Sequence, residues 1–316
     1  LYSFLCIIQT FTEFNIFDLF AESSLSSATN YYRFGLVRSY GSFNTSINNA
    51  LFLVMASCVI LYLIENESNV KEHKKYIFSY VICIFAVCAC MSRGPLLLLL
   101  FTIILYLIKK GLFKFIYRNI IKISATLIVV VILFSVIKPF RVVLENFINM
   151  YLAIFDEETS QSISTSFGVN PGGVGERLLL YNWVGEKIVD HEMLGLGPSS
   201  VPEFNYIDEW NKLRTKRSLE NHYLKMVYNF GYIGLALFVL FTIKMLMRVY
   251  KLYKYYDLHN ISFYYMAFVA ELIYIICIFI VASVDDMRMY YFIICITELL
   301  YGRFYKYEEE QKVLVG

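Results

Sequence analysis

Charged residues are scarce in this chain. Only 17% of the 316 residues are Asp, Glu, Lys or Arg, whereas a soluble protein of this size usually carries about a quarter. Apolar residues make up 58%, and they gather in runs long enough to cross a bilayer, which needs about 20 residues. The net charge of +2 gives no reason to expect a nucleic acid as a partner. The composition predicts a membrane protein.

Several signatures of soluble enzymes are also missing. The chain contains no metal-ligand motif, Walker sequence or Ser-His-Asp ordering, and Gly195–Pro198 follows no strand pattern that a nucleotide-binding loop would need. All seven cysteines lie in apolar runs, which favours helix packing over disulfides or a zinc site. We therefore expect neither a metal nor a cofactor. Leu1 opens an apolar stretch without the basic region of a signal peptide, so we expect it to belong to a helix whose earlier neighbours are missing.

Seven apolar runs after that stretch are candidate membrane spans. One break needs an argument, because Ser92-Arg93-Gly94-Pro95 divides a run of 32 residues that would extend about 48 Å as one helix. Proline disfavours helical geometry at the residue before it and suits the first turn of a new helix, so two spans are expected. The spans are Asn48–Ile64, Ile77–Met91, Pro95–Ile108, Ile120–Ile137, Met226–Met247, Ile261–Ala282 and Met287–Leu300.

Basic residues in the short connections set the orientation. Lys109, Lys110, Lys114, Arg118 and Lys122 form a connection without an acidic residue, which is typical of the cytoplasmic side. A second cytoplasmic connection and a tail on the same side are marked by Lys244, Arg248, Lys251, Lys254, Arg303 and Lys306. Residues 21–47, Ser92–Pro95, Lys138–Lys225 and Asp285–Arg288 then face outward.

These assignments predict an all-α membrane protein, a polytopic helix bundle with one large outer loop that contains short helices. We divide it into an N-terminal transmembrane part (1–138, truncated, with the outer loop 21–47), the large loop (139–225), and C-terminal transmembrane helices with a cytoplasmic tail (226–316). The loop is too long to be an idle connection. Within it, Arg177–Asp190 is expected to form an amphipathic helix with Leu180, Tyr181, Val184 and Ile188 on one stripe.

Arginines at the outer membrane edge are the main chemical signal. A guanidinium is planar and permanently charged, so it can bind phosphate oxygens through two hydrogen bonds. Each arginine could instead extend to the lipid headgroups or pair with an acidic neighbour, as Arg288 could with Asp285 and Asp286. The candidates for an anion site are Arg38, Arg93, Arg177, Arg214, Arg217 and Arg288.

Glu220 and His222 are the candidate proton acceptors. They stand just before the span that begins at Met226, where either could take a proton from a sugar hydroxyl. The same stretch could equally be a polar helix start, with Asn221 or Ser218 as the N-cap. The two interpretations are compatible.

Four segments together resemble the O-antigen ligases and Wzy-type O-antigen polymerases. Met91-Ser92-Arg93-Gly94 resembles the Ser-Arg-Gly motif of that family. Arg177 with Trp183 and His191–Gly197 resembles its loop pattern, Asn221–Leu224 with Phe230–Leu235 resembles the start of its next span, and Arg38 with Gly41, Phe43 and Asn44 resembles its earlier outer loop. The family's usual histidine position falls on Glu220 here, which leaves open whether Glu220 or His222 is the base.

The resemblance implies a GT-C-like, inverting, metal-independent glycosyltransferase of the bacterial inner membrane with its site on the periplasmic side. The implied function is an O-antigen or capsule polysaccharide polymerase that joins repeats carried on undecaprenyl diphosphate. Arg93, Arg177 and Arg38 would hold the diphosphate, and Glu220 or His222 would act as the base. Implied partners are the lipid-linked donor and acceptor, the bilayer and a chain-length regulator protein.

Two other functions stay open at this point. An O-antigen ligase would transfer the glycan to lipid A core instead of to another repeat. A transporter of lipid-linked sugars is less favoured, because it predicts ionisable residues within the spans, where only Glu271 and Glu298 stand out.

Overall fold

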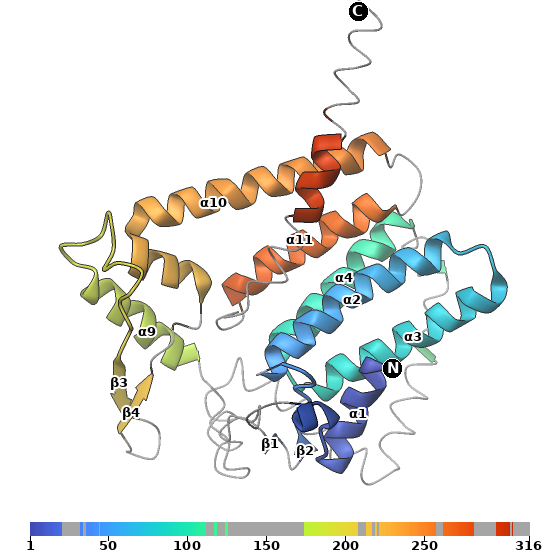
Figure 1. Cartoon of the computed structure of the whole chain (residues 1–316), viewed down its shortest axis with the longest axis horizontal. Helices are drawn as coiled ribbons and strands as arrows, with labels where there is room; N and C mark the ends of the chain where they lie inside the picture. The colour runs from blue at the N-terminus through green and yellow to red at the C-terminus, as the bar shows by residue number, and fades with distance from the viewer. Residues whose placement is uncertain are drawn as a thin grey trace, which may run out of the picture.

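The computed structural model describes residues 1–20, 32–33, 36–43, 45–111, 117–118, 124–125, 174–207, 213–216, 219, 221–256, 262–280, 295–303 and 305. Most of these residues are helical (Figure 1). The helices are α1 (Tyr2–Thr12), α2 (Ser46–Asn66), α3 (Val70–Ala89), α4 (Arg93–Lys109), α9 (Val174–Lys187), α10 (His222–Tyr256) and α11 (Phe263–Ile280), with a 3₁₀ turn η1 (Ile16–Phe20).

Two short hairpins correct the all-α expectation. Strand β1 (Tyr32–Arg33) pairs with β2 (Leu36–Val37), and β3 (Phe204–Ile207) pairs with β4 (Leu213–Lys216), both antiparallel. Phe204 packs edge-on against Trp183 of α9, with ring centroids 5.6 Å apart. The second hairpin is therefore supported by tertiary packing, since an isolated two-stranded hairpin is marginal in water.

Helices occupy most of the predicted spans. The run of 32 residues is divided into α3 and α4 at the predicted position, while α10 begins four residues before the predicted start at Met226. Within the described residues, α2 and α10 are long and apolar enough to cross a membrane, and α1 and Phe263–Ile278 are shorter apolar helices. The predicted span Ile120–Ile137 and most of Met287–Leu300 lie outside the described residues.

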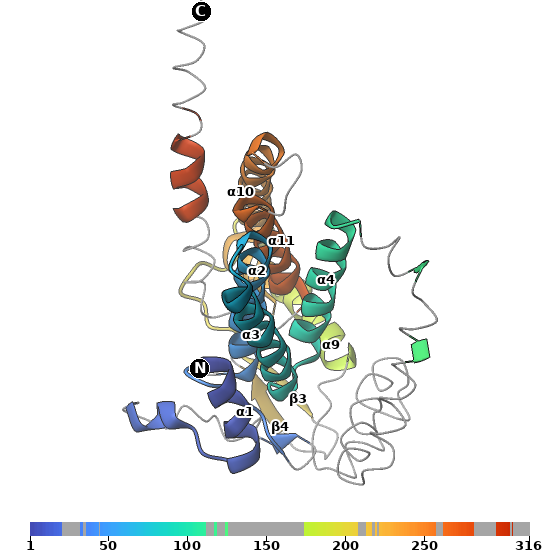
Figure 2. The same cartoon turned by 90° about the vertical axis from the view of Figure 1, so that its right-hand side faces the viewer.

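The core lies where these helices meet. Helix α2 packs against α3, α4 and α11, and α11 packs against α10. Leu53, Leu99 and Ile273, from α2, α4 and α11, are almost completely buried in one apolar cluster. Figure 2 shows α2, α3, α10 and α11 as a narrow layer with α4 beside it.

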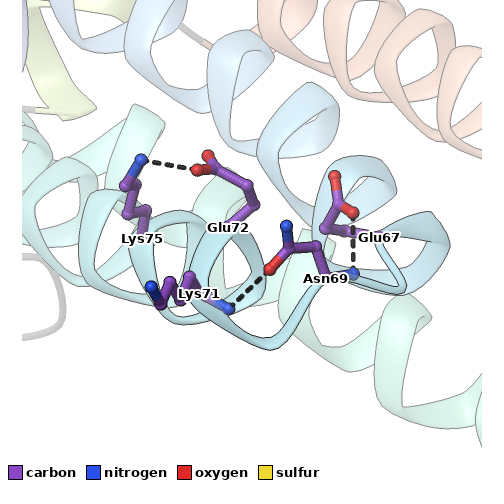
Figure 3. A network of polar contacts seen from close by, with 5 residues as sticks. All are labelled: Glu67, Asn69, Lys71, Glu72 and Lys75. Atoms are coloured by element: carbon purple, nitrogen blue, oxygen red, sulfur yellow. Dashed lines mark hydrogen bonds and ion pairs between the residues drawn. The ribbon is translucent and has the colours of Figure 1, made fainter.

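Capping contacts order the turn between α2 and α3 (Figure 3). The Asn69 side chain accepts from the backbone N–H of Lys71 at 3.0 Å, and the Glu67 carboxylate accepts from the backbone N–H of Asn69 at 2.9 Å. Such caps satisfy backbone donors that the first turn of a helix leaves open. Lys75 pairs with Glu72 at 2.5 Å, so part of the basic charge in this turn is balanced locally.

The bundle has two chemically different ends. At the end that we call the lysine end, Lys110 pairs with Glu65, Lys109 donates to the hydroxyl of Tyr253 at 3.0 Å, and Tyr265 donates to the carbonyl of Leu105 at 2.7 Å. These contacts bring together the last turns of α2, α4 and α10 and the first turn of α11. Helices α2 and α4 therefore begin at the opposite end, where α11 finishes.

Candidate functional site

Arg38 lies at that opposite end, which we call the arginine end. Its side chain is only 8% exposed, and Nε donates to the carbonyl of Cys90 at 3.3 Å. The neighbouring Ser39 donates its backbone N–H to Ala89 at 3.1 Å. The segment after β2 is thereby bound to the last turn of α3, which brings Arg38 close to the start of α4.

A buried polar clamp, formed by Gln9, Asn49, Ser39 and Gly41, fixes this segment. Gln9 of α1 accepts from the Ser39 hydroxyl at 3.0 Å and from the backbone N–H of Gly41 at 3.1 Å. Asn49 of α2 donates to the Ser39 carbonyl at 3.3 Å. Both amide side chains are almost fully buried. Because buried polar groups favour arrangements in which they are hydrogen-bonded, the clamp gives the segment a defined path.

Arg93 is the first residue of α4. Met91, two residues earlier, adopts a left-handed backbone conformation with φ of 48°, which is uncommon for a residue other than glycine and lets the chain turn sharply out of α3. A helix N-terminus presents unpaired backbone N–H groups and the positive end of the helix dipole. The guanidinium of Arg93 thus originates where an anion is already favoured.

The two arginines are electrostatically coupled. Burial lowers the pKa of Arg38 to about 10, because removal from water disfavours the charged guanidinium. Smaller electrostatic contributions come from Cys90, which raises the pKa, and from the positive charge of Arg93, which lowers it. Arg38 remains protonated at neutral pH. Two cations and a helix N-terminus therefore share one region of the arginine end.

His222 begins α10 and is 9% exposed. Its ring lies 5.0 Å, centroid to centroid, from that of Phe238, sixteen residues later in the same helix. The next residue, Tyr223, donates to the carbonyl of Ile275 near the end of α11 at 3.3 Å. Since α11 finishes at the arginine end, His222 lies at the same end of the bundle as Arg38 and Arg93.

Asn221 is the N-cap that the sequence suggested. Its side-chain oxygen accepts from the backbone N–H of Leu224 at 3.2 Å, and its amide donates to the hydroxyl of Tyr181 in α9 at 2.5 Å. The start of α10 is therefore attached to the loop helix immediately next to His222. Arg177 lies in α9, four residues or about one turn before Tyr181.

A break in α10 explains how His222 meets Phe238. Gly231 has φ of 64° and ψ of −167°, and Figure 1 shows the first turns of α10 doubling back beside its long part. In a continuous helix, the carbonyls of Tyr228 and Asn229 would accept from the N–H groups of residues 232 and 233. Here, the N–H groups of Leu196 and Gly197 donate to those carbonyls, both at 2.9 Å.

The released donors bind the same loop segment in return. The N–H of Tyr232 donates to the carbonyl of Glu192 at 2.7 Å, and that of Ile233 donates to Met193 at 3.3 Å. We call these four bonds the main-chain exchange. A Cβ atom on Gly231 would lie 2.3 Å from the Met193 backbone, and one on Gly195 would lie 2.5 Å from Asn229. Both glycines are therefore required for the close approach.

The loop elements have an apolar cluster of their own. Leu180 and Val184 of α9, with Ile188 in the turn just after it, are buried against residues that include Leu224 and Tyr228 of α10. This set matches the predicted stripe except for Tyr181, which is 41% exposed and binds Asn221 instead. The ring of Trp183 stacks on that of Tyr228, with centroids 5.8 Å apart.

The structure brings together some of the predicted site residues and does not describe others. Arg38, Arg93 and His222 lie at one end of the bundle. For Arg177 and Arg214, only the backbone is described, in α9 and β4. Glu220, Arg217 and Arg288 lie outside the described residues. Sequence reasoning missed Gln9, Asn49 and the bond of Tyr181, because each depends on a partner distant in sequence.

Two acidic residues within helices had been noted as exceptions. Glu298, in the helical residues 295–303, pairs with Arg248 of α10. Glu271 of α11 is completely buried, and neither of its carboxylate oxygens has a hydrogen-bond partner among the described residues. The ion pair with Arg248 explains why an acidic residue stands at position 298, whereas no contact among the described residues explains the buried carboxylate of Glu271.

Comparison with known proteins agrees with the resemblance seen in the sequence. No curated protein and no solved structure matches the chain. The family described as O-antigen ligase (Wzy_C) matches residues 78–239, slightly more than half of the 316 residues. The matched region runs from α3 through Arg93, the loop helix and the main-chain exchange into the long part of α10. The chain belongs to the O-antigen ligase family.

Proposed function

We propose that the protein is an O-antigen or capsule polysaccharide polymerase, which joins repeats carried on undecaprenyl diphosphate at the periplasmic face of the inner membrane. Members of the family are membrane enzymes of glycan assembly that transfer glycans. One observation supports the proposal most strongly. Arg38, Arg93 and the start of α4 lie at the same end of the bundle as His222.

In the proposed reaction, the arginines bind the diphosphate of the donor. His222, or Glu220 in its place, takes the proton of an acceptor hydroxyl, and the oxygen attacks C1 of the donor sugar from the face opposite the diphosphate. The bond between C1 and the phosphate oxygen breaks, and the diphosphate leaves with the electron pair. Cations near the leaving group stabilise this developing charge, which is the main contribution that such a site can make.

The proposal is tested by complementing a deletion strain with variants at matched expression. Arg93→Ala, Arg177→Ala and Glu220→Ala or His222→Ala should each yield single-repeat glycan in place of a ladder. Lys71→Ala, at an exposed position in the first turn of α3, serves as the control and should restore the ladder. If all the site variants restore long chains, the proposed site is wrong.

The same strains separate the polymerase from the ligase. Loss of a ligase leaves long polymer on the lipid carrier, whereas loss of a polymerase leaves a single repeat. His222→Gln and Glu220→Gln distinguish the two candidate bases, because only replacement of the base should remove turnover while donor binding is kept.

A transporter of lipid-linked sugars is the second candidate, and the buried Glu271 is the observation that favours it. Ionisable groups inside membrane helices often mark transport routes. Glu271→Gln should leave polymerisation by purified protein intact if the polymerase proposal holds. Loss of lipid-linked repeat from the outer leaflet, with normal polymerisation of added substrate, would favour transport.

A further inference from the structure

The turn that joins α9 to the main-chain exchange exposes large apolar side chains. Leu194 and Met193 are 74% and 64% exposed, and Val189 is also exposed. Neither Met193 nor Leu194 belongs to the apolar cluster beneath α9, although Ile188 before them and Leu196 after them contribute to it. Adjacent apolar side chains that protrude in this way indicate a contact surface rather than a packing site.

This surface continues onto the outside of α10. The main-chain exchange holds Glu192 and Met193 beside Tyr232 and Ile233. From there, Ile233, Leu237 and Leu240 are exposed at intervals of four and three residues, so they form one stripe along the helix. Helix α10 is long and apolar enough to cross a membrane, and most of its apolar stretch is not buried against the rest of the protein. An exposed apolar stripe on such a helix suits contact with lipid.

The residues around the tip fit the boundary between lipid and water. Asp190, His191 and Glu192 precede Met193 and are exposed, so their polar groups can stay in the headgroup region. Tyr232, which is exposed beside the tip, is a residue type enriched at that boundary. A tip with two apolar side chains behind three polar ones suits shallow insertion, of the order of 5–10 Å as for interfacial helices.

We infer that Met193 and Leu194 insert into the outer leaflet and anchor the loop to the bilayer surface, independently of the proposed reaction. The occupant of this apolar surface is the same lipid that covers the stripe of α10, because the two surfaces are continuous. Through the main-chain exchange, the anchored turn also fixes the positions of α9 and of the start of α10 relative to the bilayer surface.

The experiment uses the full-length protein in liposomes, with tryptophan placed at the tip. Leu194→Trp is compared with Thr215→Trp, an exposed position in β4, whose hairpin extends away from α10 in Figure 1. Emission from the native Trp183 and Trp210 is subtracted by using the unsubstituted protein. Phosphatidylcholine brominated near the headgroup end of its acyl chains should quench Leu194→Trp strongly and Thr215→Trp weakly, and aqueous iodide should show the reverse order.

Met193→Trp provides a second reading in case Leu194→Trp is poorly folded. Equal lipid quenching at positions 194 and 215 would overturn the inference, as would strong iodide quenching at both tip positions. Protection of both from lipid and from iodide would indicate a protein contact, such as a second copy of the chain, and would also overturn it. The measurement needs no substrate, so failure of the proposed reaction would not change its result.

Discussion

Arg38 carries its charge at neutral pH although its side chain is almost entirely removed from water. The carbonyl of Cys90 and the polar clamp hold the residue there, while Arg93 repels it. Because burial lowers the pKa of this base from its ordinary value to about 10, the guanidinium is charged in both the folded and the unfolded chain at pH 7, and the full cost of burying that charge reduces stability there. That cost diminishes only as the pH rises above about 10. A bound diphosphate would offset it, since an anion stabilises the charged form.

Arg38→Gln should therefore separate activity from stability. The variant should lose the glycan ladder, because the proposed diphosphate site loses a cation. Its thermal unfolding midpoint at pH 7 should stay equal or rise. The free energy of unfolding should increase by at most about 3 kcal/mol, since each unit of lowered pKa corresponds to about 1.4 kcal/mol. Gel analysis of glycan and thermal unfolding in detergent are the two measurements. A lower midpoint would show that Arg38 is structural.

Tyr181→Phe should slow turnover without unfolding the loop. The change removes only the hydroxyl that accepts from Asn221, so the residue before His222 loses its support from α9. Loss of one hydrogen bond is worth about 1 kcal/mol. We expect kcat to fall about fivefold with little change in KM, as measured with purified protein and lipid-linked repeats. The exposed Tyr117→Phe is the matched control, and equal rates for both variants would contradict the role of Tyr181.

The break in α10 requires glycine at position 231. Gly231→Ala would place a methyl group 2.3 Å from the Met193 backbone at a φ of 64°. We expect the free energy of unfolding of the loop to fall by about 1–3 kcal/mol, because the strained backbone conformation and the steric overlap are both unfavourable. Gly185→Ala in α9 is the control, since its added Cβ meets no atom within 4 Å and alanine favours a helix. Limited proteolysis of the loop measures the difference, and equal cleavage rates would argue against the exchange.

Sequence alone predicted elements well where one rule decided them. The run of 32 residues was divided correctly because Pro95 marks the start of α4, and the stripe of α9 follows from its helical period. The β3–β4 hairpin was missed because its strands have four residues each and are supported by Trp183. The break in α10 was missed because Gly231 is tolerated in a helix until a second segment supplies replacement hydrogen bonds.

The candidate site shows the same division. The sequence identified Arg38, Arg93 and His222 as separate candidates, because an ionisable residue close to a membrane span is energetically costly and therefore suggests a function. Their common end depends on contacts between residues far apart, such as Ser39 with Ala89 and Tyr223 with Ile275. Such contacts follow from tertiary packing, which no local pattern records.

For the whole molecule, the two chemically distinct ends imply a defined orientation in the membrane. Cysteine labelling with a membrane-impermeant maleimide tests it. A Cys295→Ser background removes the exposed native thiol. In spheroplasts, Thr215→Cys, on the loop side, should react at once, whereas Gly111→Cys, beside Lys110 at the lysine end, should react only after lysis. The opposite pattern would place the arginine end in the cytosol and remove the basis for a periplasmic site.

The main-chain exchange joins the loop to α10 without using a side chain. Its four bonds connect peptide groups only, so they require room at Gly195 and Gly231 and a residue other than proline at the four donor positions 196, 197, 232 and 233. Side chains on either side of this joint can therefore be replaced without breaking the four bonds, so the loop surface can change in chemistry while its attachment to α10 stays the same.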